Sequence, residues 1–136
     1  MNPTDNIPDF TNYGYKVVKE LEKDKQRSCI IWQGIAINSN TPVAIKQFIF
    51  ATKDSSWSGY NAYQREIDLL KSLSHPGIPK YIADFETDNS FCFVREYING
   101  ESLAKKTNLT ERELKTIAVK VLNILRCIRM VRKKCC

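Results

Sequence analysis

Short segments rich in β-branched and aromatic residues mark five strands in this chain, and apolar and polar positions alternate in the one around residue 46. Val43, Ile45 and Phe48 are β-branched or aromatic, and the alternation around them places Ala44 and Lys46 together on one strand face. Comparable patterns predict strands over residues 15–21, 29–36, 43–50, 80–86 and 91–96. We therefore expect a sheet built largely from neighbouring segments of the chain.

The spacing of apolar residues changes to three and four between residues 60 and 73, which predicts a helix there. The apolar stripe contains Tyr63, Ile67, Leu70 and Leu73. Glu66 borders that stripe, so its carboxylate can point toward the sheet. The residues 51–59 before the helix are expected to form a loop, and Pro76 and Gly77 follow its end.

A second helix is expected to start after Thr110, because Thr110 and Glu113 have the spacing of a capping box. Its apolar face contains Leu114, Ile117, Ala118, Val121, Leu122, Leu125 and Ile128. Such a stripe ordinarily packs into a core. Little of the sequence follows this helix, so what the stripe packs against is an open question.

These elements predict one α+β domain, since 136 residues suit a single modest core. We divide the chain into a flexible leader at 1–14, a sheet-and-helix unit at 15–98 and a helical segment with a basic tail at 99–136. The content of 43% apolar and 26% charged residues is that of an ordinary globular protein.

The sequence contains no run of eighteen apolar residues and no signal peptide, so a cytoplasmic location without membrane insertion is the expectation. Its five cysteines are scattered and lack Cys-x-x-Cys spacing, which favours reduced thiols over a zinc site or a disulfide framework.

The net charge of +6 comes from one end of the chain. Residues 1–104 hold 11 Lys and Arg against 13 Asp and Glu, whereas residues 105–136 hold 10 against 2. A nucleic-acid groove would need basic residues interleaved with aromatic ones on a sheet or recognition helix. We therefore do not expect a nucleic acid as the partner.

Four motifs occur in an order and spacing that resemble the N-terminal lobe of a protein kinase. They are Val43-Ala44-Ile45-Lys46, Glu66 twenty residues after Lys46, His75-Pro76-Gly77-Ile78, and Phe93 to Gly100. The sequences of the segments Trp57 to Tyr60 and Ser74 to Pro79 are most similar to those of serine/threonine kinases of cyanobacteria. The resemblance runs from about Tyr15 to about Leu125. It implies a kinase-like N-lobe with a five-stranded antiparallel sheet and one long helix, then a hinge and an incomplete helical C-lobe.

The resemblance also implies an ATP site. Lys46 would hold the α- and β-phosphates of ATP and pair with Glu66. Ala44 would line the adenine pocket together with Ile30, or with Cys29 if the preceding loop has the usual length. The backbone at Glu96 and Ile98 would hydrogen-bond the adenine edge. Arg95 falls at the gatekeeper position, where the family usually has a medium-sized apolar side chain.

The segment from Glu22 to Ser28 departs from the family, because it has no glycine where the family carries its glycine-rich loop. Glu22 and Asp24 would repel phosphate if they faced it, and Lys23, Lys25 and Arg27 could partly compensate. We expect weakened ATP binding.

The 136 residues contain no His-Arg-Asp, Asp-Phe-Gly or Ala-Pro-Glu segment. Without a catalytic base or magnesium ligands, no residue is a catalytic candidate, Mg²⁺ is not expected to be held, and phosphoryl transfer by this chain is not expected. The basic, cysteine-containing stretch from Arg126 resembles an out-of-frame extension, which suggests a truncated kinase. The alternative is a pseudokinase or binding module that docks on a partner, or on itself, through the Leu114–Ile128 helix face.

Overall fold

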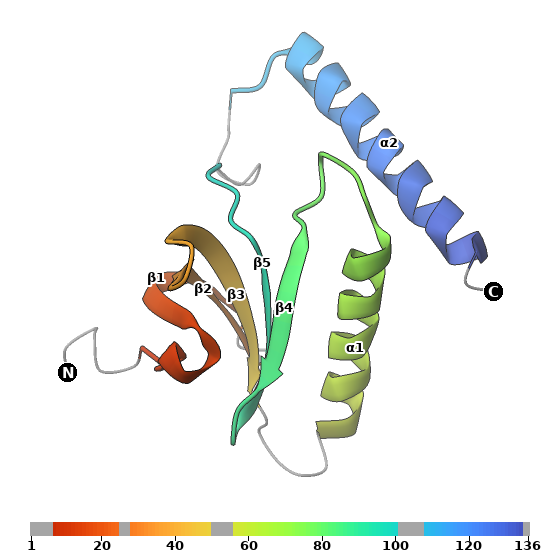
Figure 1. Ribbon diagram of the computed structural model, residues 1–136. Helices are drawn as coiled ribbons and strands as arrows, with labels where there is room; N and C mark the ends of the chain where they lie inside the picture. Colours follow the sequence, from red (N-terminus) through yellow and green to blue (C-terminus); the bar gives the residue numbers. More distant parts are fainter. Residues whose placement is uncertain (1–6, 25–27, 50–55, 101–107, 135–136) are drawn as a thin grey trace.

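Five strands form a single antiparallel sheet with the order β1-β2-β3-β5-β4. The computed structural model describes residues 7–24, 28–49, 56–100 and 108–134. The strands are β1 Tyr15–Asp24, β2 Cys29–Ala36, β3 Thr41–Ile49, β4 Tyr81–Glu86 and β5 Ser90–Glu96. The helices are the short 3₁₀ helix η2 Thr11–Tyr13, α1 Ser56–Ser72 and α2 Glu111–Lys134. The expected α+β class and five-stranded sheet are confirmed (Figure 1).

Several element boundaries differ from the expectation. Helix α1 begins at Ser56, within the expected loop 51–59, because the helix accommodates Gly59 despite its cost of about 1 kcal/mol relative to Ala. Strand β1 continues to Asp24 because the charged residues Glu22, Lys23 and Asp24 still pair with β2. Backbone pairing there overrides their low strand propensity. Phe50, at the expected end of the third strand, lies outside the described residues.

Residues 7–14 of the expected leader pack against the sheet. Phe10 is only 2% exposed and its ring makes an edge contact with Phe85 at 5.1 Å between centroids. Tyr13 stacks on the same ring at 4.3 Å. Gly14, at a φ of +92°, adopts a left-handed conformation that favours glycine and directs the chain into β1. Aromatic packing therefore holds this segment, although it has no periodic pattern; residues 1–6 lie outside the described part.

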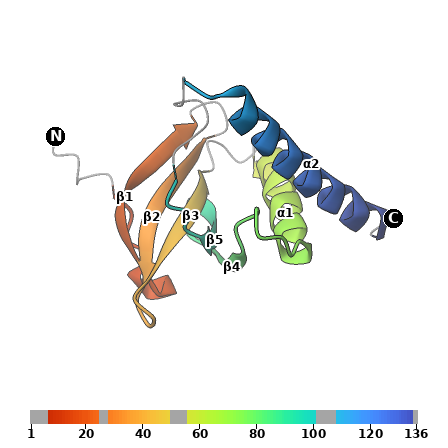
Figure 2. The ribbon, with the colours of Figure 1, turned by 90° about the horizontal axis from the view of Figure 1, so that it is seen from above.

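Each sheet face carries its own apolar cluster, as alternation requires. On one face the cluster contains Phe10, which directly precedes η2, together with Trp32, Val43, Ile45, Cys92 and Val94. The other face packs against α1 through Tyr63, Ile67, Phe91 and Phe93. Figure 2 shows α1 and α2 on the same side of the sheet. The face that α1 covers is also the face that carries Lys46.

A buried polar chain crosses the cluster beneath η2. Trp32 Nε1 donates to Gln47 Oε1 at 2.9 Å, and Gln47 Nε2 donates to Ser90 Oγ at 3.1 Å. Gln47 and Ser90 are both buried, so each hydrogen bond replaces one that water would otherwise make.

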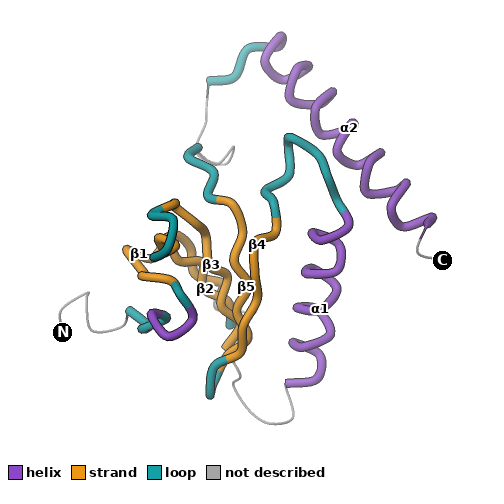
Figure 3. The backbone as a smooth tube through the Cα atoms, viewed as in Figure 1, coloured by secondary structure: helices purple, strands orange, loops and turns teal. Residues whose placement is uncertain are grey.

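Helix α2 starts as the capping box predicts, since the main-chain N–H of Glu113 donates to Thr110 Oγ1 at 3.1 Å. The helix approaches the connection between α1 and β4 (Figure 3), where a Cβ on Gly77 would lie 2.8 Å from Ile124 Cδ1. Ile117 and Ile128 of the expected apolar face are half-buried. The rest of that face is exposed: Leu114, Ala118, Val121, Leu122 and Leu125.

Replacing Gln47 with Leu is expected to lower the free energy of unfolding by about 1–3 kcal/mol, because the Trp32 N–H and the Ser90 hydroxyl lose a buried partner. Urea denaturation followed by Trp fluorescence measures the change. The control is Gln33→Leu, a half-buried glutamine on the neighbouring strand. Equal stabilities for the two variants would contradict the role given to the buried chain.

Candidate functional site

Lys46 lies near the middle of β3, which is the central strand of the sheet. Its Cα partners are Ile31 on β2 and Phe93 on β5, while Ala44 lies opposite Gln33 and Arg95. Partners in an antiparallel sheet project from the same face, so these side chains surround Lys46 and Ala44 on the α1 side. The register therefore creates one platform with a single lysine at its centre.

Glu66 reaches this platform from α1. Lys46 Nζ donates to both carboxylate oxygens of Glu66, at 2.8 Å to Oε1 and 3.0 Å to Oε2. The Lys46 side chain is 19% exposed and that of Glu66 is 37% exposed. The expected Lys46–Glu66 pair is present, and it remains open to solvent on one side.

Two buried residues of α1 set the position of Glu66. Tyr63 lies one turn before it and Ile67 immediately after it, and both pack against the sheet. The Tyr63 hydroxyl donates to the carbonyl oxygen of Cys92 at 3.0 Å. Burial raises the pKa of Tyr63 above its ordinary value, so the hydroxyl stays a donor into the alkaline range.

The two alternatives for the second pocket-lining residue project from opposite faces. Ile30 is paired with Gln47 and packs on the cluster beneath η2, away from Lys46. Cys29 is buried on the Lys46 side, as its pairing with Phe48 requires. Burial raises the pKa of the Cys29 thiol, and Lys46 opposes this shift. The register therefore places Cys29, and not Ile30, on the strand face that carries Lys46.

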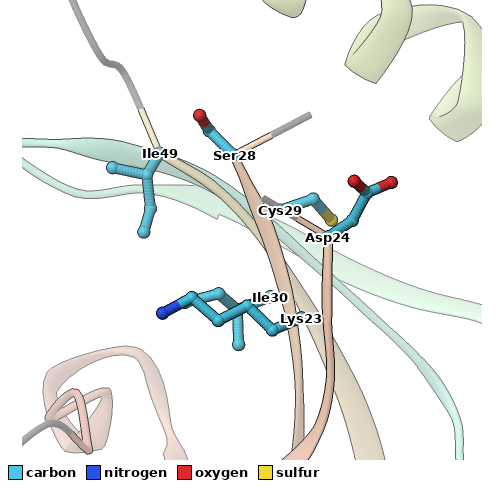
Figure 4. A pocket seen from close by; sticks show the side chains of 6 residues that line it. All are labelled: Lys23, Asp24, Ser28, Cys29, Ile30 and Ile49. Atoms are coloured by element: carbon cyan, nitrogen blue, oxygen red, sulfur yellow. The ribbon is translucent and has the colours of Figure 1, made fainter. Parts of the chain in front are cut away.

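Acidic residues of β1 share the Lys46 face. Glu22 is the partner of Ile31 and Asp24 is the partner of Cys29, whereas Lys23 is the partner of Ile30 on the other face. Figure 4 shows Cys29 beside Asp24 and Ile30 beside Lys23. The expected compensation by Lys23 is therefore not available on the Lys46 face, and Lys25 and Arg27 lie outside the described residues.

The residues in Figure 4 line a pocket of about 220 Å³ at the end of the β1–β2 hairpin. They are Lys23, Asp24, Ser28, Cys29, Ile30 and Ile49. Neither Lys46 nor Glu66 lines it. The pocket draws side chains from both faces, so we do not place the functional site there.

Arg95 adds a second cation beside Ala44. It is half-buried at the end of β5, and burial lowers the pKa of its guanidinium, while Glu66 and Glu22 oppose that shift. Arginine stays charged at neutral pH even so. The side chain therefore places a partly desolvated positive charge on the platform.

The expected hinge follows directly. The main-chain N–H of Glu96 donates to the carbonyl of Lys80 at 2.9 Å, and the Glu96 carboxylate accepts from the Lys80 N–H at 3.3 Å. Ile98 is exposed, and its carbonyl accepts from the Gly100 N–H at 3.1 Å. These bonds fix the chain as it leaves the sheet; residues 101–107, the link to α2, lie outside the described part.

Two features are absent from the described ranges. No helix there is long and apolar enough to cross a membrane. No group of three or more His, Cys, Asp or Glu side chains there could hold a metal ion.

Comparison with known proteins assigns the fold. A profile of the family described as "Protein kinase domain" matches residues 27–131. The chain belongs to the protein kinase family. Its sheet and α1 form a kinase N-lobe, as the motifs implied. The kinase match extends past Leu125, where the resemblance was expected to stop, into the basic stretch that α2 continues through.

Serine/threonine kinases from several kingdoms are similar to this kinase chain. Serine/threonine-protein kinase cds1 of Schizosaccharomyces pombe is 29% identical over 84% of the chain, and the match covers 26% of the length of cds1. Serine/threonine-protein kinase D of Synechocystis sp. is 29% identical over 84% of the chain, and the match covers 24% of that kinase's length. Probable serine/threonine-protein kinase YbdM of Bacillus subtilis is 36% identical over 49% of the chain, and the match covers 26% of that kinase's length. The chain spans 7–26% of the length of the curated relatives it matches.

Sequence reasoning did not identify two aromatic rings next to Lys46. Lys46 Nζ lies 5.2 Å from the centroid of the Phe48 ring and 5.8 Å from that of Phe93. Phe48 could have been found, because it is two residues from Lys46 on the same strand and so shares its face. Phe93 required knowledge of the β3–β5 pairing.

The alkaline stability of the kinase chain tests the anchoring of α1. Because the folded state keeps Tyr63 protonated above its ordinary pKa of 10, the free energy of unfolding is expected to fall as the pH rises above 10. Tyr63→Phe should make this fall smaller and should cost about 1 kcal/mol at neutral pH through the lost hydrogen bond. Urea titrations between pH 7 and 11 measure both effects.

The matched control for that experiment is Tyr60→Phe, which alters an exposed tyrosine of the same helix. If Tyr63→Phe and the unmodified protein lost stability equally above pH 10, the anchoring role of Tyr63 would be wrong.

Proposed function

We propose that this chain is the nucleotide-binding lobe of a serine/threonine protein kinase and that it binds ATP weakly. The observation that carries the proposal is the two-oxygen contact between Lys46 and Glu66, on the same strand face as Ala44. Membership of the kinase family supports it. The complete activity would be ATP-dependent phosphorylation of Ser or Thr in proteins.

In this proposal each residue has one task. Lys46 binds the α- and β-phosphates, and Glu66 holds the ammonium in place. Ala44 and Cys29 contact the adenine ring in preference to Ile30, because Cys29 shares the Lys46 face. The main-chain groups at Glu96 and Ile98 bind the adenine edge. ATP supplies the transferable phosphoryl group.

Electrostatics on the Lys46 face supports weak binding. Glu22, Asp24 and Glu66 bring three carboxylates to the face that would receive a triphosphate. Arg95 places a charged, partly desolvated group beside Ala44, where an adenine ring would pack. Repulsion and desolvation both oppose the lysine's attraction for phosphate.

The same proposal holds that these 136 residues do not transfer phosphate by themselves. The support for this part is that the His-Arg-Asp and Asp-Phe-Gly motifs, which supply the family's base and metal ligands, do not occur in the 136 residues. The proposal includes a cytoplasmic location, which the scattered cysteines favour.

Titration of a fluorescent ATP analogue into the purified chain tests the binding. We expect saturable binding that Lys46→Met weakens at least about tenfold, the size of one charge-assisted contact. The control is Lys71→Met, because Lys71 is an exposed lysine that pairs with Asp84 from α1. Equal affinities for the two variants would reject the site.

Removing the β1 carboxylates tests the explanation for weak binding. The double variant Glu22→Gln with Asp24→Asn is expected to bind the ATP analogue about two- to fivefold more tightly, because two charges that repel phosphate are gone. Glu20→Gln is the matched control, since Glu20 pairs with Trp32 and so projects from the opposite face. A gain as large for Glu20→Gln, or none for the double variant, would contradict the explanation.

A second candidate function is a binding module, and the exposure of α2 favours it. Leu114, Leu122 and Leu125 are each more than half exposed, and Val121 lies beside them. An exposed apolar stripe of this kind commonly marks an interaction surface. We propose self-association of the chain as its simplest use.

Sedimentation of the purified chain tests this candidate. Self-association should increase with concentration, and Leu122→Glu with Leu125→Glu should give a monomer, because charges cannot be buried there without partners. The control is Lys115→Glu with Lys120→Glu, which changes exposed charges on the same helix. A monomeric unmodified chain at all concentrations would exclude self-association.

A further inference from the structure

The ammonium group of Lys46 is enclosed by two aromatic rings and a carboxylate. Phe48 follows it by two residues on β3, and Phe93 is its Cα partner on β5, so both rings rise from the same face as the lysine. Their centroids lie 5.2 Å and 5.8 Å from Nζ. Both distances are within the range at which a ring face attracts a cation.

The rings and the carboxylate do not use all the hydrogen-bond donors of the Lys46 ammonium. An ammonium group has three N–H donors, and Glu66 accepts from Nζ with both oxygens. The rings attract the charge without accepting a directed hydrogen bond of ordinary strength. Within the described part of the chain, this arrangement holds the ammonium laterally and leaves donor capacity for an anion from outside.

The rings themselves are held in place. Phe48 and Phe93 lie 6.2 Å apart between centroids, and Phe93 is fully buried. Tyr63 contacts Phe48 edge-on at 5.6 Å and is tied to β5 through its hydroxyl. Rotation of either ring away from Lys46 would therefore disturb the docking of α1.

We propose that Phe48 and Phe93 are positioning residues that hold Lys46 in its phosphate-binding orientation before any nucleotide arrives. A lysine side chain otherwise loses much rotamer freedom on binding, and a lysine already held loses less. Since the described residues contain no glycine-rich turn that could cradle phosphates, the affinity would depend more strongly on a lysine that is already held in place. The nucleotide part of this inference rests on the proposed function.

A pair of substitutions at Phe48 separates ring chemistry from packing. Phe48→Leu keeps an apolar side chain but removes the ring, whereas Phe48→Tyr keeps the ring at this half-buried position. Phe85→Leu is the control, because Phe85 is a strand phenylalanine packed against the opposite face. It removes an aromatic ring without touching Lys46.

Two readouts are measured on each variant: NMR shifts of the Lys46 ε-methylene, which ring currents displace, and the affinity for the fluorescent ATP analogue. We expect Phe48→Leu to lose part of the ring-current displacement and to bind about two- to fivefold more weakly. Phe48→Tyr should resemble the unmodified protein in both readouts. Phe85→Leu should leave both unchanged even if it lowers stability.

The readouts distinguish failure of this inference from failure of the proposed function. If Phe48→Leu leaves the Lys46 shifts unchanged, or changes them without weakening binding, the positioning role is wrong. If the unmodified protein binds no nucleotide, the proposed function fails, and the Lys46 shifts in the free protein decide whether the rings hold the lysine.

Discussion

The ion pair between Lys46 and Glu66 is the interaction on which the proposed nucleotide site depends. It joins the central strand to α1, the helix that covers this face of the sheet. The position of each side chain is set by its neighbours. Pairing of β3 on both edges orients Lys46, while Tyr63 and Ile67 orient Glu66. A pair this exposed contributes little to stability, so its geometry is a consequence of the packing around it.

The surroundings of that pair are the basis for the proposal that this kinase lobe binds ATP weakly. Glu22 and Asp24 bring negative charge to the Lys46 face, and Arg95 takes the position beside Ala44. Phe48 and Phe93 act in the opposite sense, because they attract the ammonium without neutralising it. The balance of these effects, more than the presence of the lysine, determines whether a triphosphate is bound.

The strands, the Lys46–Glu66 pair and the capped second helix could be predicted because each leaves a local signal in the sequence. The residues missed or misplaced depend on contacts between distant segments. Phe10 is buried because it packs against the distant Phe85. Ile30 projects away from Lys46 because the β2–β3 register pairs it with Gln47. The start of α1 at Ser56 was not predicted, because the low helix propensity of Gly59 favours a loop there.

The most direct test of the account is the coupling between Lys46 and Glu66 in ATP binding, measured by a double-mutant cycle. Affinities are compared for the unmodified chain, Lys46→Met, Glu66→Gln and the double variant. If Glu66 acts only by holding Lys46, the double variant should bind no more weakly than Lys46→Met alone. Additive losses would mean that the two residues act independently, and would contradict the central role given to their pair.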